Sequence, residues 1–214
     1  MKDRDRYDVS GLSEAQFEPG SGGKVLRNLL GIQSTKKMDN VEAKALEIAT
    51  DELIRTVDAG HRFTAADICK FHKAWLGKIY AWAGSYRQVN ISKDDFPFAA
   101  AAQIPSLMKE FEKNVLRRNT PCNFRERPEV VHALAETHVE LVLIHPFREG
   151  NGRVTRVLST LMALQAGLPL LDFGLITGET KETYFAAVQA GLDKNYKPME
   201  RLFAEIIERS LAAS

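Results

Sequence analysis

The run "PEVVHALAETHVELVLIHPFREGNGRVTRVLSTLMALQAG" (128–167) predicts two helices joined by a short loop. Apolar residues recur at helical spacing before the loop, as in a helix with a buried side. Pro146 cannot continue that helix, so we expect His145 to lie at its end. The second helix is predicted to begin at Asn151 or Gly152, after the turn "EGNG", and to end at a glycine.

The start of the second helix carries an unusual charge. The first turn of any helix has N–H groups without partners inside the helix, and this end of the helix dipole is positive. Arg153 and Arg156 nevertheless lie there, three positions apart and therefore on the same side. Two cations at this end are unfavourable unless an anion lies between them, and the glycines let an anion approach the backbone. The pattern therefore predicts a phosphate site, and the two arginines favour a polyphosphate.

Two residues beside this phosphate site predict chemistry. Glu149 follows His145 by four positions, and one carboxylate together with phosphate oxygens is a usual arrangement for Mg²⁺. His145 can accept a proton near neutral pH. Base, metal ligand, phosphate site and arginines together predict phosphoryl or nucleotidyl transfer to a hydroxyl group. The spacing alone leaves open a second interpretation, in which an ordinary Gly-Asn-Gly turn between two helices is flanked by surface charges.

The remainder of the chain predicts an all-α domain that carries one β-hairpin. Residues 1–32 are expected to form an irregular segment that packs on the body, which leaves 33–214 as the domain itself. "YRQVNIS" (86–92) alternates apolar and polar residues and predicts a hairpin or flap over 85–98. Further helical patterns lie at about 35–54, 65–83, 104–116, 179–191 and 198–212.

Histidine and tryptophan side chains outside the 144–156 run are expected to be packing or surface residues. His72, His132 and His138 each stand alone on a helical pattern, and a lone histidine there is usually not a ligand. Trp75 and Trp82 have apolar neighbours, which is typical of core positions.

Charge and composition argue against several classes of protein. The 214 residues carry a net charge of only +1, so we expect no direct contact with nucleic acid. The chain shows no apolar run long enough to span a bilayer and no Sec-type signal, so we expect no membrane contact. Two cysteines without a CxxC pattern predict neither a disulfide framework nor a zinc site, and they favour a cytoplasmic location.

Read as HxFx[D/E]GNGRxxR, residues 145–156 resemble the signature of Fic-domain proteins, and every position matches. "IYAWAGSYRQVNIS" (79–92) is similar to the family segment that leads into its flap hairpin, and "FAAAAQIPSLM" (98–108) is similar to the family segment after the flap. The resemblance extends over roughly residues 25–205.

The resemblance implies a compact helical fold with one hairpin flap. It also implies transfer of AMP from ATP to a Ser, Thr or Tyr hydroxyl of a target protein, with release of pyrophosphate. His145 would be the general base, Phe147 would be structural, and Glu149 would hold Mg²⁺ on the α- and β-phosphates. The anion hole and the arginines that contact the phosphates would be Gly150, Asn151, Gly152, Arg153 and Arg156.

The resemblance also provides candidates in two other places. The positions similar to those that line the family's adenine pocket are Tyr184, Asn195 and Tyr196. The hairpin would dock the backbone of the target by strand addition. Its candidate residues for that contact are Ile91, Lys93 and Asp95.

"VLRNLLGI" (25–32) is similar to a segment of bacterial Fic toxins that work with a separate antitoxin. Many Fic proteins carry an inhibitory helix that reads [S/T]xxxE[G/N], whose glutamate pairs with the second arginine of the motif. Residues 35–40 fit that spacing but carry Asp39 in place of glutamate, and residues 10–14 are followed by alanine. We therefore expect a small separate antitoxin to supply the inhibitory glutamate.

Alternative activities stay open at this point. Doc-type relatives transfer the γ-phosphate, although their motif departs from EGNGR, and one relative transfers phosphocholine with a similar motif. A non-catalytic nucleotide sensor is a further alternative, but binding alone needs no base and His145 is intact. By resemblance to Fic toxins of similar size, a type II topoisomerase subunit is a candidate target.

Overall fold

Helices account for most of the chain, and one short hairpin interrupts them. The computed structural model describes residues 11–93, 95–176 and 180–213. The helices are α1 (Thr35–Thr56), α2 (Ala65–Leu76), α3 (Ile104–Phe111), α4 (Arg117–Asn119), α5 (Arg127–Ile144), α6 (Asn151–Gln165), α7 (Thr180–Ala190) and α8 (Lys197–Ala212), and the strands are β1 (Ser92–Lys93) and β2 (Phe96–Pro97). The predicted all-α fold with one hairpin is confirmed. None of the helices in these described ranges is long and apolar enough to cross a bilayer.

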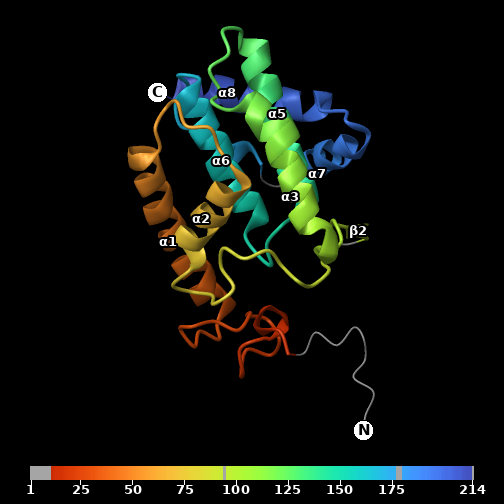
Figure 1. Ribbon diagram of the computed structural model, residues 1–214. Helices are drawn as coiled ribbons and strands as arrows, with labels where there is room; N and C mark the ends of the chain where they lie inside the picture. The colour runs from red at the N-terminus through yellow and green to blue at the C-terminus, as the bar shows by residue number, and fades with distance from the viewer. Residues whose placement is uncertain (1–10, 94, 177–179, 214) are drawn as a thin grey trace.

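Helix α5 lies at the centre because its sequence is apolar on nearly every side. Most of its residues from Val130 to Ile144 are buried, and it packs against α3, α6, α7 and α8. Helices α1 and α2 pack on each other and on α6, whereas α7 and α8 pack on each other and on α5, and α8 runs behind α5 in Figure 1. The loop between α5 and α6 is therefore held by two helices that are themselves anchored in the core.

Side-chain caps fix where the first two helices begin. Ser34 is the N-cap of α1, and its hydroxyl accepts a hydrogen bond from the backbone N–H of Lys37. Thr64 is the N-cap of α2. Its hydroxyl accepts from the N–H of Asp67, and the Asp67 carboxylate accepts from the N–H of Thr64, so the two residues form a capping box. Both caps satisfy N–H groups that the helix itself leaves without partners.

The hairpin is shorter than the predicted range of 85–98. Only Ser92 with Pro97 and Lys93 with Phe96 pair as antiparallel strands. Of the preceding residues, Ile91 still accepts from the N–H of Phe98 at 3.2 Å, whereas others bond to distant parts of the molecule. The N–H of Arg87, for example, donates to the carbonyl of Pro146 at 2.9 Å. Period-two alternation predicted the extended chain correctly, but it could not tell which partner the backbone would pair with.

The predicted helix at 104–116 also extends further than expected. α3 continues through a π turn at Glu112–Leu116 into α4, so the loop begins after Asn119. The apolar residues Val115 and Leu116 are buried, which draws this extra turn onto the core.

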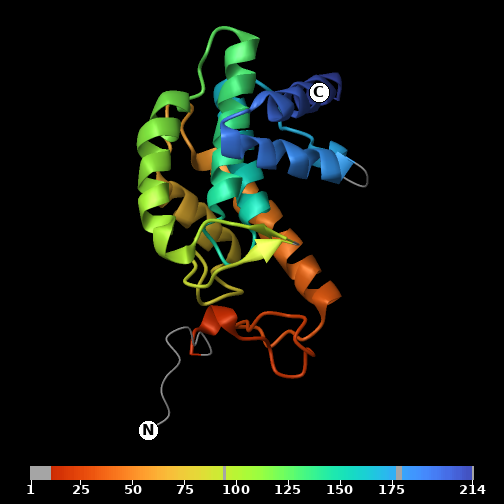
Figure 2. The same cartoon turned by 90° about the vertical axis from the view of Figure 1, so that its right-hand side faces the viewer.

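The N-terminal segment lies beneath the helices (Figure 2). Val25 and Ile32 are buried and join Trp75 and Trp82 in a second hydrophobic cluster. Both tryptophans are thus core residues, as their apolar neighbours predicted. Residues 1–10 lie outside the described ranges.

Candidate active site

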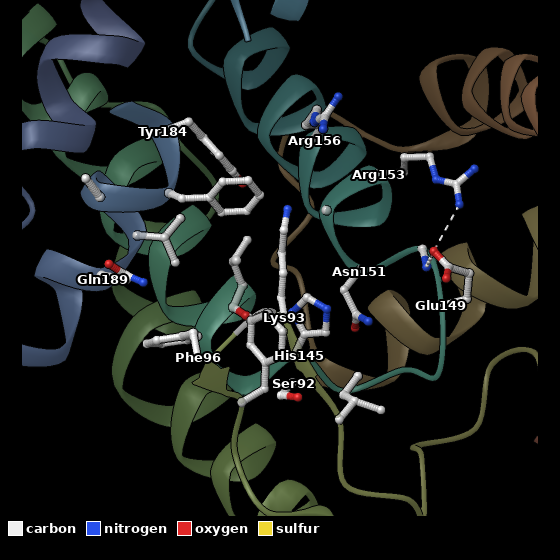
Figure 3. A pocket seen from close by; sticks show the side chains of 18 of the residues that line it. Ser92, Lys93, Phe96, His145, Glu149, Asn151, Arg153, Arg156, Tyr184 and Gln189 are labelled. Atoms are coloured by element: carbon white, nitrogen blue, oxygen red, sulfur yellow. Dashed lines mark hydrogen bonds and ion pairs between the residues drawn. The ribbon is translucent and has the colours of Figure 1, made fainter. Parts of the chain in front are cut away.

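A cavity of about 1090 Å³ opens between the hairpin, the α5–α6 loop and α7. The predicted residues that line it are Ile91, Lys93, Asp95, His145, Glu149, Gly150, Asn151, Gly152, Arg153, Arg156 and Tyr184. Figure 3 shows the Lys93 side chain of the hairpin standing above His145, with Tyr184 of α7 to its upper left. Residues from three distant parts of the sequence therefore meet around one cavity.

Two of the predicted adenine-pocket residues do not line this cavity. The chain turns away after α7, because Lys194 adopts a left-handed backbone (φ 57°). The Tyr196 hydroxyl then donates to Glu140 at 2.6 Å, and the side-chain oxygen of Asn195 accepts from the N–H of Lys197 at 3.3 Å. Of the three candidates, the structure brings only Tyr184 to the cavity.

His145 is presented by a left-handed turn at the end of α5. Its backbone has φ 52° and ψ 60°, and its ring stacks on Phe98 with centroids 3.6 Å apart. Nδ1 lies 3.0 Å from the carbonyl oxygen of Val142, and a carbonyl only accepts, so Nδ1 carries the proton. The lone pair is therefore on Nε2. Burial lowers the pKa of His145 to about 4, which keeps the ring neutral and able to accept a proton at neutral pH.

The loop after His145 is closed by the side chain of Asn151. Its amide oxygen accepts from the N–H of Phe147, and its amide nitrogen donates to the carbonyl of Phe147, both at 2.8 Å. Gly150 begins α6 with φ +81°, and a Cβ there would lie 2.6 Å from the ring of Trp75. The loop thus requires glycine at this position and an amide at the next.

Backbone N–H groups at the start of α6 form the anion site. The N–H groups of Arg153 and Val154 bond to the carbonyl of Gly150. For the N–H groups of Asn151 and Gly152, no hydrogen-bond partner is found within the ranges that the structure describes. These two groups stand at the positive end of the α6 dipole, where an anion is favoured.

The two arginines of the motif have different surroundings. Arg153 forms ion pairs with Glu42 of α1 at 2.7 Å and with Glu149 at 3.3 Å. For Arg156, no carboxylate partner is found among the described residues, and its buried Nε has no hydrogen bond. Figure 3 shows Arg153 turned toward Glu149, on the side away from Arg156. Arg156 is therefore the arginine of this pair that is available to an anion.

Glu42 is a site residue that sequence reasoning missed. Its carboxylate is buried, and it accepts from the Tyr80 hydroxyl and from Arg153, each at 2.7 Å. The Trp75 indole N–H donates to the Glu42 carbonyl at 2.8 Å. A signal was present, because Glu42 occupies the same side of α1 as the buried Met38 and a carboxylate there needs a partner.

His72 is hydrogen-bonded to the same α5–α6 loop. The N–H of Gly84 donates to its Nδ1 at 2.9 Å, so Nε2 carries the proton and donates to the carbonyl of Glu149 at 3.0 Å. Its ring also stacks on Phe147 with centroids 3.9 Å apart. His72 is thus the packing residue that was expected, and it fixes the peptide that leads into Gly150.

Buried histidines are expected to make the protein less stable in acid. Burial lowers the pKa of His72 to about 4 and that of His138 to about 3. Both would titrate near 6.5 in the unfolded chain, which therefore binds more protons, so stability falls as pH drops below about 6.5. We expect a loss of about 2 kcal/mol for each of these histidines between pH 7 and pH 5, measured by urea unfolding.

The variant His72→Gln separates this effect from general acid sensitivity. Glutamine can make both bonds of His72 but does not titrate, so the difference between pH 7 and pH 5 should shrink by about 2 kcal/mol. The control is His132→Gln, which removes a half-exposed histidine instead of a buried one. An unaltered pH dependence in His72→Gln would contradict the assignment.

Comparison with known proteins adds independent information. The Fic/DOC family matches residues 62–163. The protein adenylyltransferase VbhT of Bartonella schoenbuchensis is 34% identical over 73% of this chain and 32% of its own length. The Fic protein of Escherichia coli is 27% identical over 88% of this chain and 90% of its own. This chain thus spans about a third of VbhT but most of the Escherichia coli protein.

A solved structure agrees with the fold. The N-terminal Fic domain of a VirB-translocated effector from Bartonella quintana, with bound ADP, superimposes with a TM-score of 0.71. It is 27% identical, and the match covers 91% of this chain and 94% of the other. A nucleotide is therefore a ligand of a structurally similar domain.

Proposed function

This chain belongs to the Fic/DOC family, and we propose that it is a protein adenylyltransferase that moves AMP from ATP to a hydroxyl of a target protein. The observation that carries the proposal is the position of His145. Its proton-accepting Nε2 lies in the same cavity as Arg156 and the N–H groups at the start of α6. A nucleotide sensor would need the cation and the N–H groups but not a buried neutral base.

In the proposed reaction, the target hydroxyl attacks the α-phosphorus of ATP. A bond forms between the hydroxyl oxygen and that phosphorus, the bond to the β-phosphate bridging oxygen breaks, and pyrophosphate leaves. His145 takes the hydroxyl proton on Nε2. The N–H groups of Asn151 and Gly152 would stabilise the charge that develops on the phosphate oxygens, and Arg156 would bind the departing pyrophosphate.

Glu149 can act as a magnesium ligand only if the other ligands come from nucleotide and water. The described residues contain no group of three or more His, Cys, Asp or Glu side chains placed to hold a metal ion. A carboxylate at the cavity wall therefore fits only a cation whose other ligands are phosphate oxygens and water. With nucleotide present, Glu149 would hold Mg²⁺, which would offset the negative charge of the leaving group.

The hairpin and α7 would hold the two substrates. Ile91, Lys93 and Asp95 line the cavity close to His145, and the short strands offer backbone groups to an extended segment of the target. Tyr184 would line the adenine site, with its ring fixed because its hydroxyl lies 2.9 Å from Nε2 of His138.

We also propose that a separate antitoxin binds this protein. Asp39, the acidic residue of the incomplete inhibitory motif, is exposed near the start of α1, and no contact between it and Arg156 is found in the described ranges. Arg156 thus lacks a carboxylate from the described part of its own chain, which supports an inhibitory glutamate from another protein. The toxin role and a type II topoisomerase subunit as target rest on the sequence resemblance.

Labelled ATP tests the reaction directly. We expect label from [α-³²P]ATP, but not from [γ-³²P]ATP, to appear on a protein of a bacterial lysate that contains Mg²⁺. Mass spectrometry would then identify the modified protein and the added AMP. Transfer from the γ-position would instead indicate a Doc-like phosphotransferase, and label from a phosphocholine donor would indicate that alternative. Nucleotide binding without any transfer would contradict the proposal in favour of a sensor.

A further inference from the structure

Arg87 is a completely buried guanidinium outside the cavity. Its side chain is 1% exposed, and it precedes the hairpin rather than belonging to the 145–156 motif. Burying a charged group is costly unless it is well bonded. Within the described residues, the hydrogen-bond partners of this guanidinium are main-chain carbonyls, and the carboxylate of Glu14 acts on it through its charge alone. Such a costly arrangement needs a compensating role.

The guanidinium joins three pieces of backbone that surround the cavity. Nε donates to the carbonyl of His145 at 2.8 Å. Nη1 donates to Val89, on the segment that enters the hairpin, at 2.7 Å. Nη2 donates to Ala99, on the segment that leaves it, at 2.5 Å. Because the guanidinium is planar and rigid, these three carbonyls are fixed relative to one another.

The contact with His145 stabilises a strained backbone conformation. His145 has a left-handed backbone, which is uncommon and strained for a residue other than glycine. Its carbonyl is bonded to Nε of Arg87, and the next carbonyl, of Pro146, is bonded to the N–H of Arg87. Arg87 therefore holds both peptides of the turn that directs the imidazole into the cavity.

We propose that Arg87 is a positioning residue, which holds the backbone of His145 and both ends of the hairpin as one rigid unit. The inference rests on the proposed function, because it assumes that His145 is the base and that the hairpin docks the target. The unit would keep the base and the docked hydroxyl at a fixed separation. A shift of about 1 Å in such a separation is enough to slow a reaction about 100-fold.

Charge provides a second, separable effect of Arg87. The charged groups that act on the His145 ring are Arg87 and Lys93, which disfavour its protonation, and Glu149, which favours it. Removing the charge of Arg87 should therefore make His145 easier to protonate, and replacing it with lysine, which keeps the charge, should do so less. A residue that served only to fill space would not move this titration.

The test compares Arg87→Lys and Arg87→Met with Arg62→Lys. Arg62 also donates to a main-chain carbonyl, that of Arg117, but on an exposed loop. We expect Arg87→Lys and Arg87→Met to transfer AMP about 100-fold more slowly while they bind ATP with unchanged affinity, because Arg87 does not line the cavity. Arg62→Lys should match the parent in both measurements.

Nuclear magnetic resonance of His145 supplies a measurement that does not need activity. Its ring titration should move to higher pH by about half a unit or more in Arg87→Met, and by less in Arg87→Lys, which keeps the charge. Parent-like transfer together with an unmoved titration in Arg87→Met would overturn the proposal. So would a matching loss of ATP binding in Arg87→Lys, which would place Arg87 in nucleotide binding instead.

The two inferences can fail separately. If the parent protein transfers no AMP to any lysate protein, the proposed function fails, but the His145 titration still tests whether Arg87 acts on that residue. If Arg87→Met does not fold, the contrast between Arg87→Lys and Arg62→Lys decides whether the guanidinium fork, rather than the charge, is required.

Discussion

The variant His145→Ala is expected to lose AMP transfer by a factor of about 100 to 10,000 while it keeps its fold. In the proposed reaction, Nε2 of His145 would accept the proton of the attacking hydroxyl, because the Nδ1 proton is held by the carbonyl of Val142. Without that acceptor, the hydroxyl must attack while it is still protonated. The measurement is the initial rate of label transfer from [α-³²P]ATP, with ATP affinity and thermal unfolding measured on the same samples.

Two further variants make this result specific. His145→Asn keeps a residue that tolerates the left-handed backbone at φ 52° and should be as inactive as the alanine variant. His132→Ala removes a histidine from the same helix, half exposed and paired with Glu200, and should keep full activity. Wild-type rates in His145→Asn would show that another group accepts the proton.

The variant Glu42→Ala is expected to lower the free energy of unfolding by about 3 kcal/mol. It removes the buried carboxylate that accepts from Arg153 and from Tyr80, and it leaves both donors without that acceptor. Arg153 retains its ion pair with Glu149 at 3.3 Å and its place over the Trp75 ring, 4.6 Å from the ring centroid. Chemical unfolding at neutral pH measures the loss.

The matched control lies on the same helix. Glu47 pairs with Lys44 at 2.8 Å, but both side chains are more than half exposed, at 60% and 66%. Glu47→Ala should therefore lower the free energy of unfolding far less than Glu42→Ala, because exposed ion pairs contribute little to stability. Equal losses in the two variants would show that the Glu42 carboxylate contributes no more than a surface charge.

The sequence was most informative where function depends on neighbours in the chain. The end of α5 at Pro146, the glycine turn and the start of α6 are local features, and each was predicted within one or two residues. The signature itself has a fixed spacing, so the residues that it places together along the chain also meet in space. The hairpin was predicted to exist, but its length depended on bonds such as that of Arg87 to Pro146.

Contacts between distant elements could not be predicted in this way. Glu42 and Arg153 are 111 positions apart, and Arg87 and His145 are 58 positions apart. No local pattern encodes such pairs, because they arise only when the helices pack. The same reason explains Asn195 and Tyr196, which follow α7 closely in sequence but are carried away from the cavity by the turn at Lys194.

The pairing of Arg153 has a consequence for how a nucleotide arrives. Among the described residues that line the cavity, four are cationic and three are anionic, and the buried carboxylate of Glu42 offsets one cation from behind. The cavity is therefore close to electrical balance. A bare triphosphate would gain little long-range attraction from it, so entry as a complex with a divalent cation is favoured, and ionic strength should have little influence on the association rate.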